Sequence, residues 1–114
     1  MTANIIFEDR ENYSILHIEG DFNGTEENNA LLSSFHEISG KGVMKALLDL
    51  SKVVYLNSAS IGVLLSGNAI LKKKGGKIVL FGASDYLDNI FNVTKLNLAF
   101  DICKTEEEAI EALK

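Results

Sequence analysis

The sequence predicts a single α/β domain with a mixed, mostly parallel β-sheet, and two observations lead to this prediction. Short apolar segments of strand length alternate with segments whose apolar residues recur at helical spacing, in the order ββαβαβαβα with about four helices. The segments 43–50 and 77–81 are almost continuously apolar, as in strands that are buried on both faces of a parallel sheet. The 114 residues are sufficient for one domain, 1–114.

The first half begins with a predicted β-hairpin, with strands at 4–9 and 13–19 joined by a polar turn. The segment 20–24, Gly-Asp-Phe-Asn-Gly, is expected to end the second strand. Thr25 is a plausible N-cap for the helix that follows, because Glu26 and Glu27 then occupy the first turn, where the helix dipole favours acids. The segment Gly40-Lys41-Gly42 ends this helix.

In the second half, an apolar segment stops at Asn57–Ser58 and a long helical pattern begins immediately. Asn57 and Ser58 are both favourable N-cap residues, and the sequence leaves open which of them caps the helix. Three lysines, 72–74, lie at the negative end of the helix dipole before Gly75-Gly76. A short helix beginning at Ser84, a strand at 98–103 and a capping box at Thr105-Glu106-Glu107-Glu108 complete the predicted domain.

The composition excludes several classes of function. A net charge of −5 argues against general nucleic-acid binding, which depends on neutralising phosphates with Lys and Arg. The single cysteine, Cys103, cannot form an internal disulfide, and the first residues do not resemble a signal peptide, so we expect a cytoplasmic protein. The apolar segments are too short to span a bilayer, and a monomer without membrane insertion is expected.

Motifs for catalysis and cofactor binding are not found. His17, His36 and Cys103 lack the spacing of metal ligands. Ser58 lies in Asn-Ser-Ala-Ser-Ile-Gly, which is not a nucleophile elbow, and Gly75-Gly76 is not part of a phosphate-binding loop. We therefore expect a protein that is not an enzyme and holds no cofactor or metal.

Ser58 allows two interpretations. It could cap the helix and contribute about 1 kcal/mol to stability. It could instead be phosphorylated, because a helix N-terminus accommodates an anion, and the added charge would change only the face shown to a partner.

A longer pattern carries a family resemblance. The segment 48–65, LDLSKVVYLNSASIGVLL, resembles the core of STAS domains, particularly the bacterial anti-sigma factor antagonists. The segment Gly20-Asp21-Phe22-Asn23 is similar to the family's G-E-L-D, the segment 75–80 to its G-G-x-L-x-L strand, and Thr94-Lys95-Leu96 to its T-G-L. Asn57 and Asn23 stand where the family usually has Asp, and Ser60 where it has Gly.

The resemblance implies a STAS fold and a partner-switching protein in transcription regulation. In that family, the serine aligned with Ser58 is phosphorylated by an anti-sigma factor that is a GHKL-type serine kinase. The unmodified antagonist binds this kinase and releases the sigma factor, and a serine phosphatase resets the switch. ATP and magnesium belong to the kinase. The partner-binding residues expected here are Asn23, Asn57, Ser58, Ser60 and Ile61.

A second hypothesis is a STAS binding or scaffold module that does not depend on phosphorylation. Such a module could be the subunit of a lipid transporter or a component of a stress complex. In this case Ser58 is only a helix cap, and the amides at 23 and 57 favour this hypothesis. Identifying the tightest-binding partner distinguishes the two hypotheses.

Overall fold

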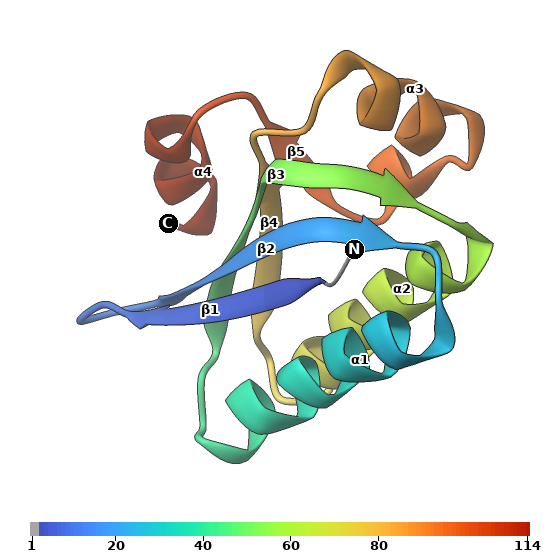
Figure 1. Ribbon diagram of the computed structural model, residues 1–114. Coiled ribbons are helices and arrows are strands. Elements are labelled where there is room, and N and C mark those ends of the chain that lie inside the picture. Colours follow the sequence, from blue (N-terminus) through green and yellow to red (C-terminus); the bar gives the residue numbers. More distant parts are fainter. Residues whose placement is uncertain (1–2) are drawn as a thin grey trace.

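A five-stranded sheet forms the centre of the computed structural model, which describes residues 3–114 (Figure 1). Its strands are β1 (Asn4–Asp9), β2 (Ser14–Phe22), β3 (Lys45–Leu56), β4 (Lys77–Phe81) and β5 (Asp101–Cys103), and they lie side by side in chain order. Only β1 and β2 are antiparallel; the other neighbours pair in parallel. The predicted mixed, mostly parallel sheet is confirmed.

Four α-helices complete the domain. They are α1 (Thr25–Gly40), α2 (Ser58–Lys72), α3 (Asp85–Val93) and α4 (Glu106–Leu113), with a short 3₁₀ helix at Leu96–Leu98. In Figure 1, α1 and α2 lie next to each other on one face of the sheet, and α4 lies on the other. The predicted element order is also confirmed.

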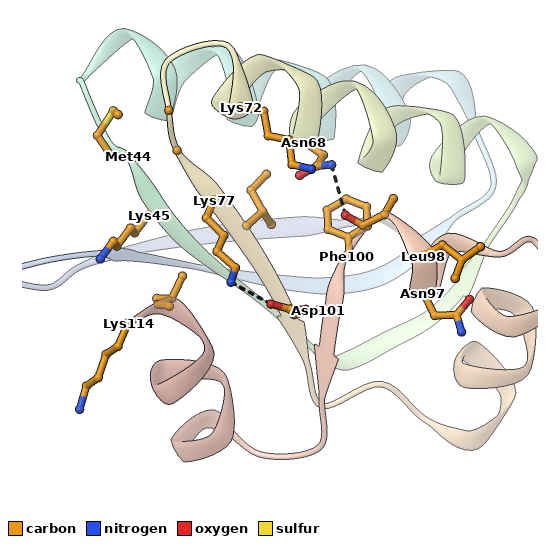
Figure 2. A pocket seen from close by; sticks show the side chains of 15 residues that line it. Met44, Lys45, Asn68, Lys72, Lys77, Asn97, Leu98, Phe100, Asp101 and Lys114 are labelled. Carbon is orange, nitrogen blue, oxygen red and sulfur yellow. Dashed lines mark hydrogen bonds and ion pairs between the residues drawn. The ribbon is translucent and has the colours of Figure 1, made fainter.

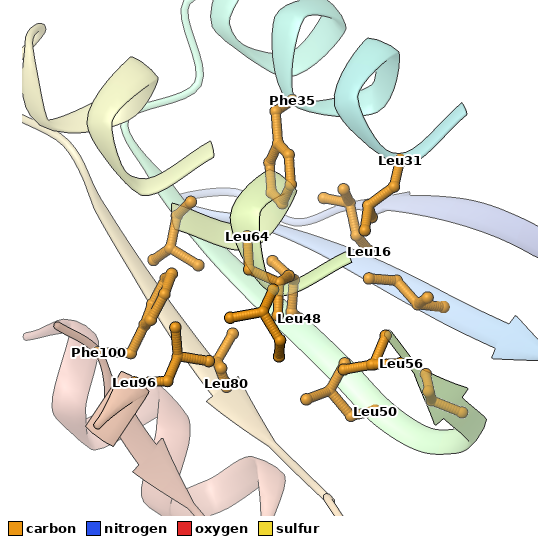
Figure 3. Packing of buried hydrophobic residues seen from close by; sticks show 14 of the residues in the cluster. Leu16, Leu31, Phe35, Leu48, Leu50, Leu56, Leu64, Leu80, Leu96 and Phe100 are labelled. Carbon is orange, nitrogen blue, oxygen red and sulfur yellow. The ribbon is translucent and has the colours of Figure 1, made fainter. Parts of the chain in front are cut away.

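The larger core lies between the sheet and α1, α2 and α3. Successive side chains of a strand point to opposite faces, so Leu16 and Leu48 face this core, where they meet Leu31 and Phe35 of α1 and Leu64 of α2 (Figure 3). All five side chains are at most 1% exposed. Burial of such side chains contributes roughly 1.5–3 kcal/mol each, which makes this the main source of stability.

A smaller core lies on the opposite face of the sheet, beneath α4. Ile15, Leu47 and Val79 from three neighbouring strands are fully buried there against Ala109 and Leu113 of α4. The capping box predicted for this helix is present: the Thr105 side chain accepts from the Glu108 backbone, and the Glu108 side chain accepts from the Thr105 backbone.

Several predicted boundaries were wrong. β2 does not end at Gly20, because Gly20 has φ 106° at a β-bulge and the strand continues to Phe22, which pairs with Leu56. β3 therefore runs on to Leu56 instead of ending at 50, whereas β5 begins only at Asp101 because the 3₁₀ helix precedes it. Gly24, not Thr25, is the N-cap residue of α1, with no side-chain hydrogen bond.

Candidate functional site: the N-terminus of helix α2

The candidate site lies where β3 ends and α2 begins, and Asn57 is the residue that caps the helix. The Asn57 side-chain oxygen accepts a hydrogen bond from the Ser60 backbone N–H at 2.9 Å. The Asn57 backbone N–H donates in turn to the Ser60 hydroxyl at 3.2 Å, so the two residues form a reciprocal capping box. The choice between Asn57 and Ser58 that the sequence leaves open is thereby settled for Asn57.

A buried polar network lies behind this cap. The Ser60 hydroxyl oxygen, which is fully buried, lies 2.7 Å from both the Phe22 carbonyl oxygen and the Asn28 side-chain oxygen, either of which can accept its proton. The Asn28 amide donates to the Asn57 side-chain oxygen at 3.2 Å. The network therefore joins the end of β2, the first turn of α1 and the start of α2. Buried polar groups that are hydrogen-bonded in this way fix the relative positions of the elements that carry them.

Ser58 is exposed and is the first residue of α2. Within residues 3–114, no group makes a hydrogen bond to the Ser58 hydroxyl, because Asn57 and Ser60 perform the capping. The first intrahelical bond is from the Ile61 N–H to the Asn57 carbonyl, so the backbone N–H groups of Ser58 and Ala59 are also available. An anion on Ser58 would lie beside these donors at the positive end of the helix dipole.

The other residues predicted for a partner-facing surface differ in exposure. Asn23 is exposed in the segment before α1, and Asn57 is partly exposed. Ser60 is fully buried, so its side chain is not part of an exposed surface. Ile61 is 8% exposed and lines a groove that also contains Ser58. The prediction of a surface position was wrong for Ser60, because its side chain completes the capping box inside the fold. Ile61 packs mostly against the core, and its place in the partner surface stays a prediction.

An aromatic groove beside Ser58 was not predicted. Tyr55 at the end of β3 stacks on Tyr86 of α3, with ring centroids 6.4 Å apart and planes at 23°. Both rings are partly exposed and line a shallow groove of about 310 Å³ together with Ser58, Ile90 and Thr94. Exposed aromatic side chains at a concave surface are typical of protein interfaces. Tyr55 lies in the motif that carries the resemblance, but the sequence does not reveal that Tyr86 lies against it.

A second polar cluster lies on the same face of the sheet as α4, beyond the part that this helix covers, because His17 and Asp49 follow Ile15 and Leu47 by two residues on β2 and β3. His17 contacts Glu8 through Nε2 and Asp49 through Nδ1, each at 2.7 Å. Burial lowers the pKa of His17, but the hydrogen bonds to Glu8 and Asp49 outweigh this effect, so the pKa is raised. The Ser51 hydroxyl donates to Asp49 and not to His17, so this cluster does not place a serine against a histidine base.

The family comparison decides the classification of this fold and site. The model of the STAS domain matches residues 4–109. The chain belongs to the STAS domain family.

Three similar proteins illustrate the range of this STAS domain's relatives. The anti-sigma-B factor antagonist of Listeria monocytogenes is 34% identical over 61 residues, which are 54% of each chain, so the match spans about half the length of that relative. An anti-sigma factor antagonist from Mycobacterium paratuberculosis has a TM-score of 0.87 at 20% identity, covering 98% of this chain and 94% of its own. The Bacillus cell fate determinant SpoIIAA, in its phosphorylated form, has a TM-score of 0.75 at 17% identity, covering 97% and 100%. The two structural likenesses concern the fold.

Two further observations concern ligands and membranes. Among residues 3–114 of the STAS domain, no group of three or more His, Cys, Asp or Glu side chains could hold a metal ion. None of the helices in this part of the chain is both long enough and apolar enough to cross a bilayer.

Proposed function

We propose that this STAS domain is a cytoplasmic anti-sigma factor antagonist whose binding to a GHKL-type serine kinase is controlled by phosphorylation of Ser58. The unmodified protein binds the kinase and thereby releases a sigma factor, and a serine phosphatase restores the unmodified form. ATP and magnesium are supplied by the kinase, so this chain acts as substrate and binding partner and not as an enzyme.

The observation that carries this proposal is that one residue caps α2 and the next residue, Ser58, is left exposed. Asn57 caps the helix, and Ser58 is exposed without a hydrogen-bonded partner among the described residues. The structural role that would otherwise explain a serine at this position is thus already filled. A phosphoryl group adds about −1.5 to −2 charges and three acceptor oxygens. At Ser58 it would meet the helix dipole and two available N–H groups without disturbing the buried network.

The proposed partner surface consists of Ser58, Asn57, Asn23 and the aromatic groove formed by Tyr55 and Tyr86. The tyrosines supply apolar contact area, and Ser58 lines the same groove. A phosphate on Ser58 would therefore introduce a strongly hydrated anion into an apolar contact, where it opposes binding by desolvation cost. This arrangement gives a physical reason for phosphorylation to release the kinase.

The test uses the anti-sigma factor kinase of the same organism with ATP and magnesium. We expect intact-mass measurement to show one added phosphoryl group, about 80 Da, on the wild-type protein. Ser58→Ala should abolish the addition, whereas Ser66→Ala, an exposed serine farther along α2, should leave it unchanged. Addition of the same mass to Ser58→Ala would exclude Ser58 as the sole acceptor.

A binding measurement separates this proposal from the phosphorylation-independent module. Under the proposal, Ser58→Glu weakens kinase binding and Ser58→Ala retains it. A protein that binds its tightest partner equally well in all three forms, and whose partner is a transporter ATPase or a stress complex, would instead be a scaffold module.

A further inference from the structure

The segment that joins β2 to α1 contains an asparagine followed directly by a glycine. Asn23 is exposed and lies outside the helices and strands, and Gly24 is the N-cap residue of α1. The side-chain carbonyl of an asparagine is open to attack by the backbone nitrogen of the next residue. This attack is least hindered before glycine, which has no Cβ. Asn23-Gly24 is the one Asn-Gly pair in the sequence.

Neither of the two groups that would react is held in place. Among residues 3–114, no hydrogen bond is formed by the side-chain amide of Asn23 or by the backbone N–H of Gly24. The Gly24 carbonyl, by contrast, accepts a hydrogen bond from the Asn28 backbone N–H at 3.2 Å. The attack therefore breaks no hydrogen bond of the folded protein.

Asn57 provides the contrast within the same site. It also precedes a small residue, Ser58, but its side chain is fixed. The Asn57 side-chain oxygen accepts from the Ser60 backbone N–H at 2.9 Å and from the Asn28 amide at 3.2 Å. Attack on this side chain would break the cap of α2 and the buried network, so the fold protects Asn57 and leaves Asn23 open.

Asparagines at the other end of the sheet are also unsuited to this reaction. Figure 2 shows that the Asn68 amide is directed at the Ala99 carbonyl, to which it donates at 3.4 Å, and Asn68 is only 9% exposed. Asn97 is exposed, but it precedes Leu98, whose bulky side chain hinders the approach of the backbone nitrogen. Exposure, a free side chain and a following glycine coincide at Asn23.

We propose that Asn23 is a site of spontaneous deamidation in the folded protein. The Gly24 backbone nitrogen loses its proton to water and attacks Cγ of Asn23, so that an N–Cγ bond forms. The Cγ–Nδ2 bond breaks, and Nδ2 takes up a proton and leaves as ammonia. Water then opens the cyclic succinimide. Cleavage of its N–Cγ bond gives aspartate, and cleavage between the nitrogen and the backbone carbonyl carbon of residue 23 gives isoaspartate.

Both products place a new negative charge beside Ser58. Phe22 and Leu56 are direct partners on β2 and β3, so Asn23 and Asn57 follow them at the same end of the sheet. Charge at an interface affects partner choice and association rate more than affinity itself. The consequence for kinase binding rests on the proposed function, whereas the deamidation does not.

Isoaspartate has an additional effect on the polar network behind the cap. The Phe22 carbonyl oxygen lies 2.7 Å from the Ser60 hydroxyl, and the Gly24 carbonyl is bonded to the Asn28 N–H. An isoaspartyl linkage inserts a methylene group into the backbone between these two anchored carbonyls. At least one anchor then has to shift, so isoaspartate at position 23 loosens the start of α1 or the cap of α2.

The test is storage of the full chain in mildly alkaline buffer, well below its unfolding temperature, followed by intact-mass measurement and peptide mapping. We expect a mass gain of about 1 Da, located at residue 23 and not at residue 57. Gly24→Ala should slow the gain by about tenfold or more, because the added methyl hinders the attack. Alanine fits the backbone there, at φ −119°, and only the flexible Glu27 side chain has to move. The matched control, Gly62→Ala, should leave the rate unchanged.

A comparison with the unfolded chain isolates the contribution of the fold. The ratio of the rates at residues 23 and 57 should fall by about tenfold in urea, because unfolding releases the Asn57 side chain. The isoaspartate fraction, separated by chromatography, should unfold at a lower urea concentration than the unmodified protein.

Three results would overturn the inference. They are the absence of a mass gain at residue 23 in the folded protein, an unchanged rate in Gly24→Ala, and a rate ratio that does not change on unfolding. Equal urea midpoints for the isoaspartate and unmodified forms would exclude the loosening of the network. None of these measurements involves the kinase, so their failure would leave the proposed function standing.

Discussion

Replacing Asn57 by alanine removes the cap of α2 and one acceptor of the buried network at the same time. Loss of an N-cap side chain costs about 1 kcal/mol. The Asn28 amide, in a residue only 6% exposed, also loses its acceptor at 3.2 Å, and an unsatisfied buried donor costs about 1–3 kcal/mol. We therefore expect the free energy of unfolding to fall by about 3 kcal/mol, and Tm to fall by about 10 °C.

The measurement is urea unfolding followed by circular dichroism, with Asn57→Asp as the matched variant. Aspartate keeps an oxygen acceptor for Ser60 and Asn28 and adds a negative charge at the helix N-terminus, which is worth about 0.3–1 kcal/mol. Asn57→Asp should therefore be at least as stable as the wild type. A loss below 1 kcal/mol in Asn57→Ala, or equal destabilisation by both variants, would refute the assigned role of the cap.

Three further predictions concern packing, pH and binding. A Cβ at Gly67 would lie 2.5 Å from the Phe35 ring, so Gly67→Ala should lower the free energy of unfolding by about 1–3 kcal/mol. A Cβ at Gly62 would meet open space, so Gly62→Ala should raise the free energy of unfolding by up to about 1 kcal/mol. Urea unfolding measures both changes. The pKa of His17 is raised in the folded protein, so its contribution to stability is present below its unfolded pKa and is lost as pH rises through its folded pKa. The pKa values of Glu8 and Asp49 are lowered, so their contribution to stability is lost as pH falls through their folded pKa values. The stability difference between wild type and His17→Gln should therefore be largest near about pH 5–6, between the reference pKa values of the carboxylates and of histidine, and should shrink at higher pH. A stability difference that does not change with pH would contradict the ion pairs assigned to His17. Tyr86→Ala should weaken binding of the anti-sigma factor kinase by about 1–3 kcal/mol in calorimetry while the protein remains folded, and unchanged affinity would exclude the aromatic groove from the interface.

The order and type of elements could be predicted because local patterns determine them. The periodicity of Leu31 and Phe35, the capping box at Thr105 and the apolar run of β4 each report on their own neighbourhood. The end of β2 was missed because Gly20 usually signals a break, and only pairing with the extended β3 shows that it forms a bulge instead.

The candidate site was predicted in part. The sequence placed Ser58 correctly at the start of α2. It did not reveal that Asn57 is the cap, because the polar network behind the cap joins Ser60 to Asn28, which lie 32 positions apart and meet only in the fold. Lys95 gives another example: it has φ 61°, a left-handed conformation, at the position where the family pattern T-G-L has glycine. There the family pattern, and not the residue type, carried the information about the backbone.

The coincidence of strand order with chain order has a consequence for synthesis on the ribosome. Each strand joins the edge formed just before it, so the sheet can grow in the direction of translation without rearrangement. The first three helices all cover the same face, and the apolar strip of Ile15, Leu47 and Val79 on the other face is covered by α4. A nascent chain therefore carries this strip uncovered until Ala109 and Leu113 have emerged, and α4 is the element that completes the protection of the new protein from aggregation.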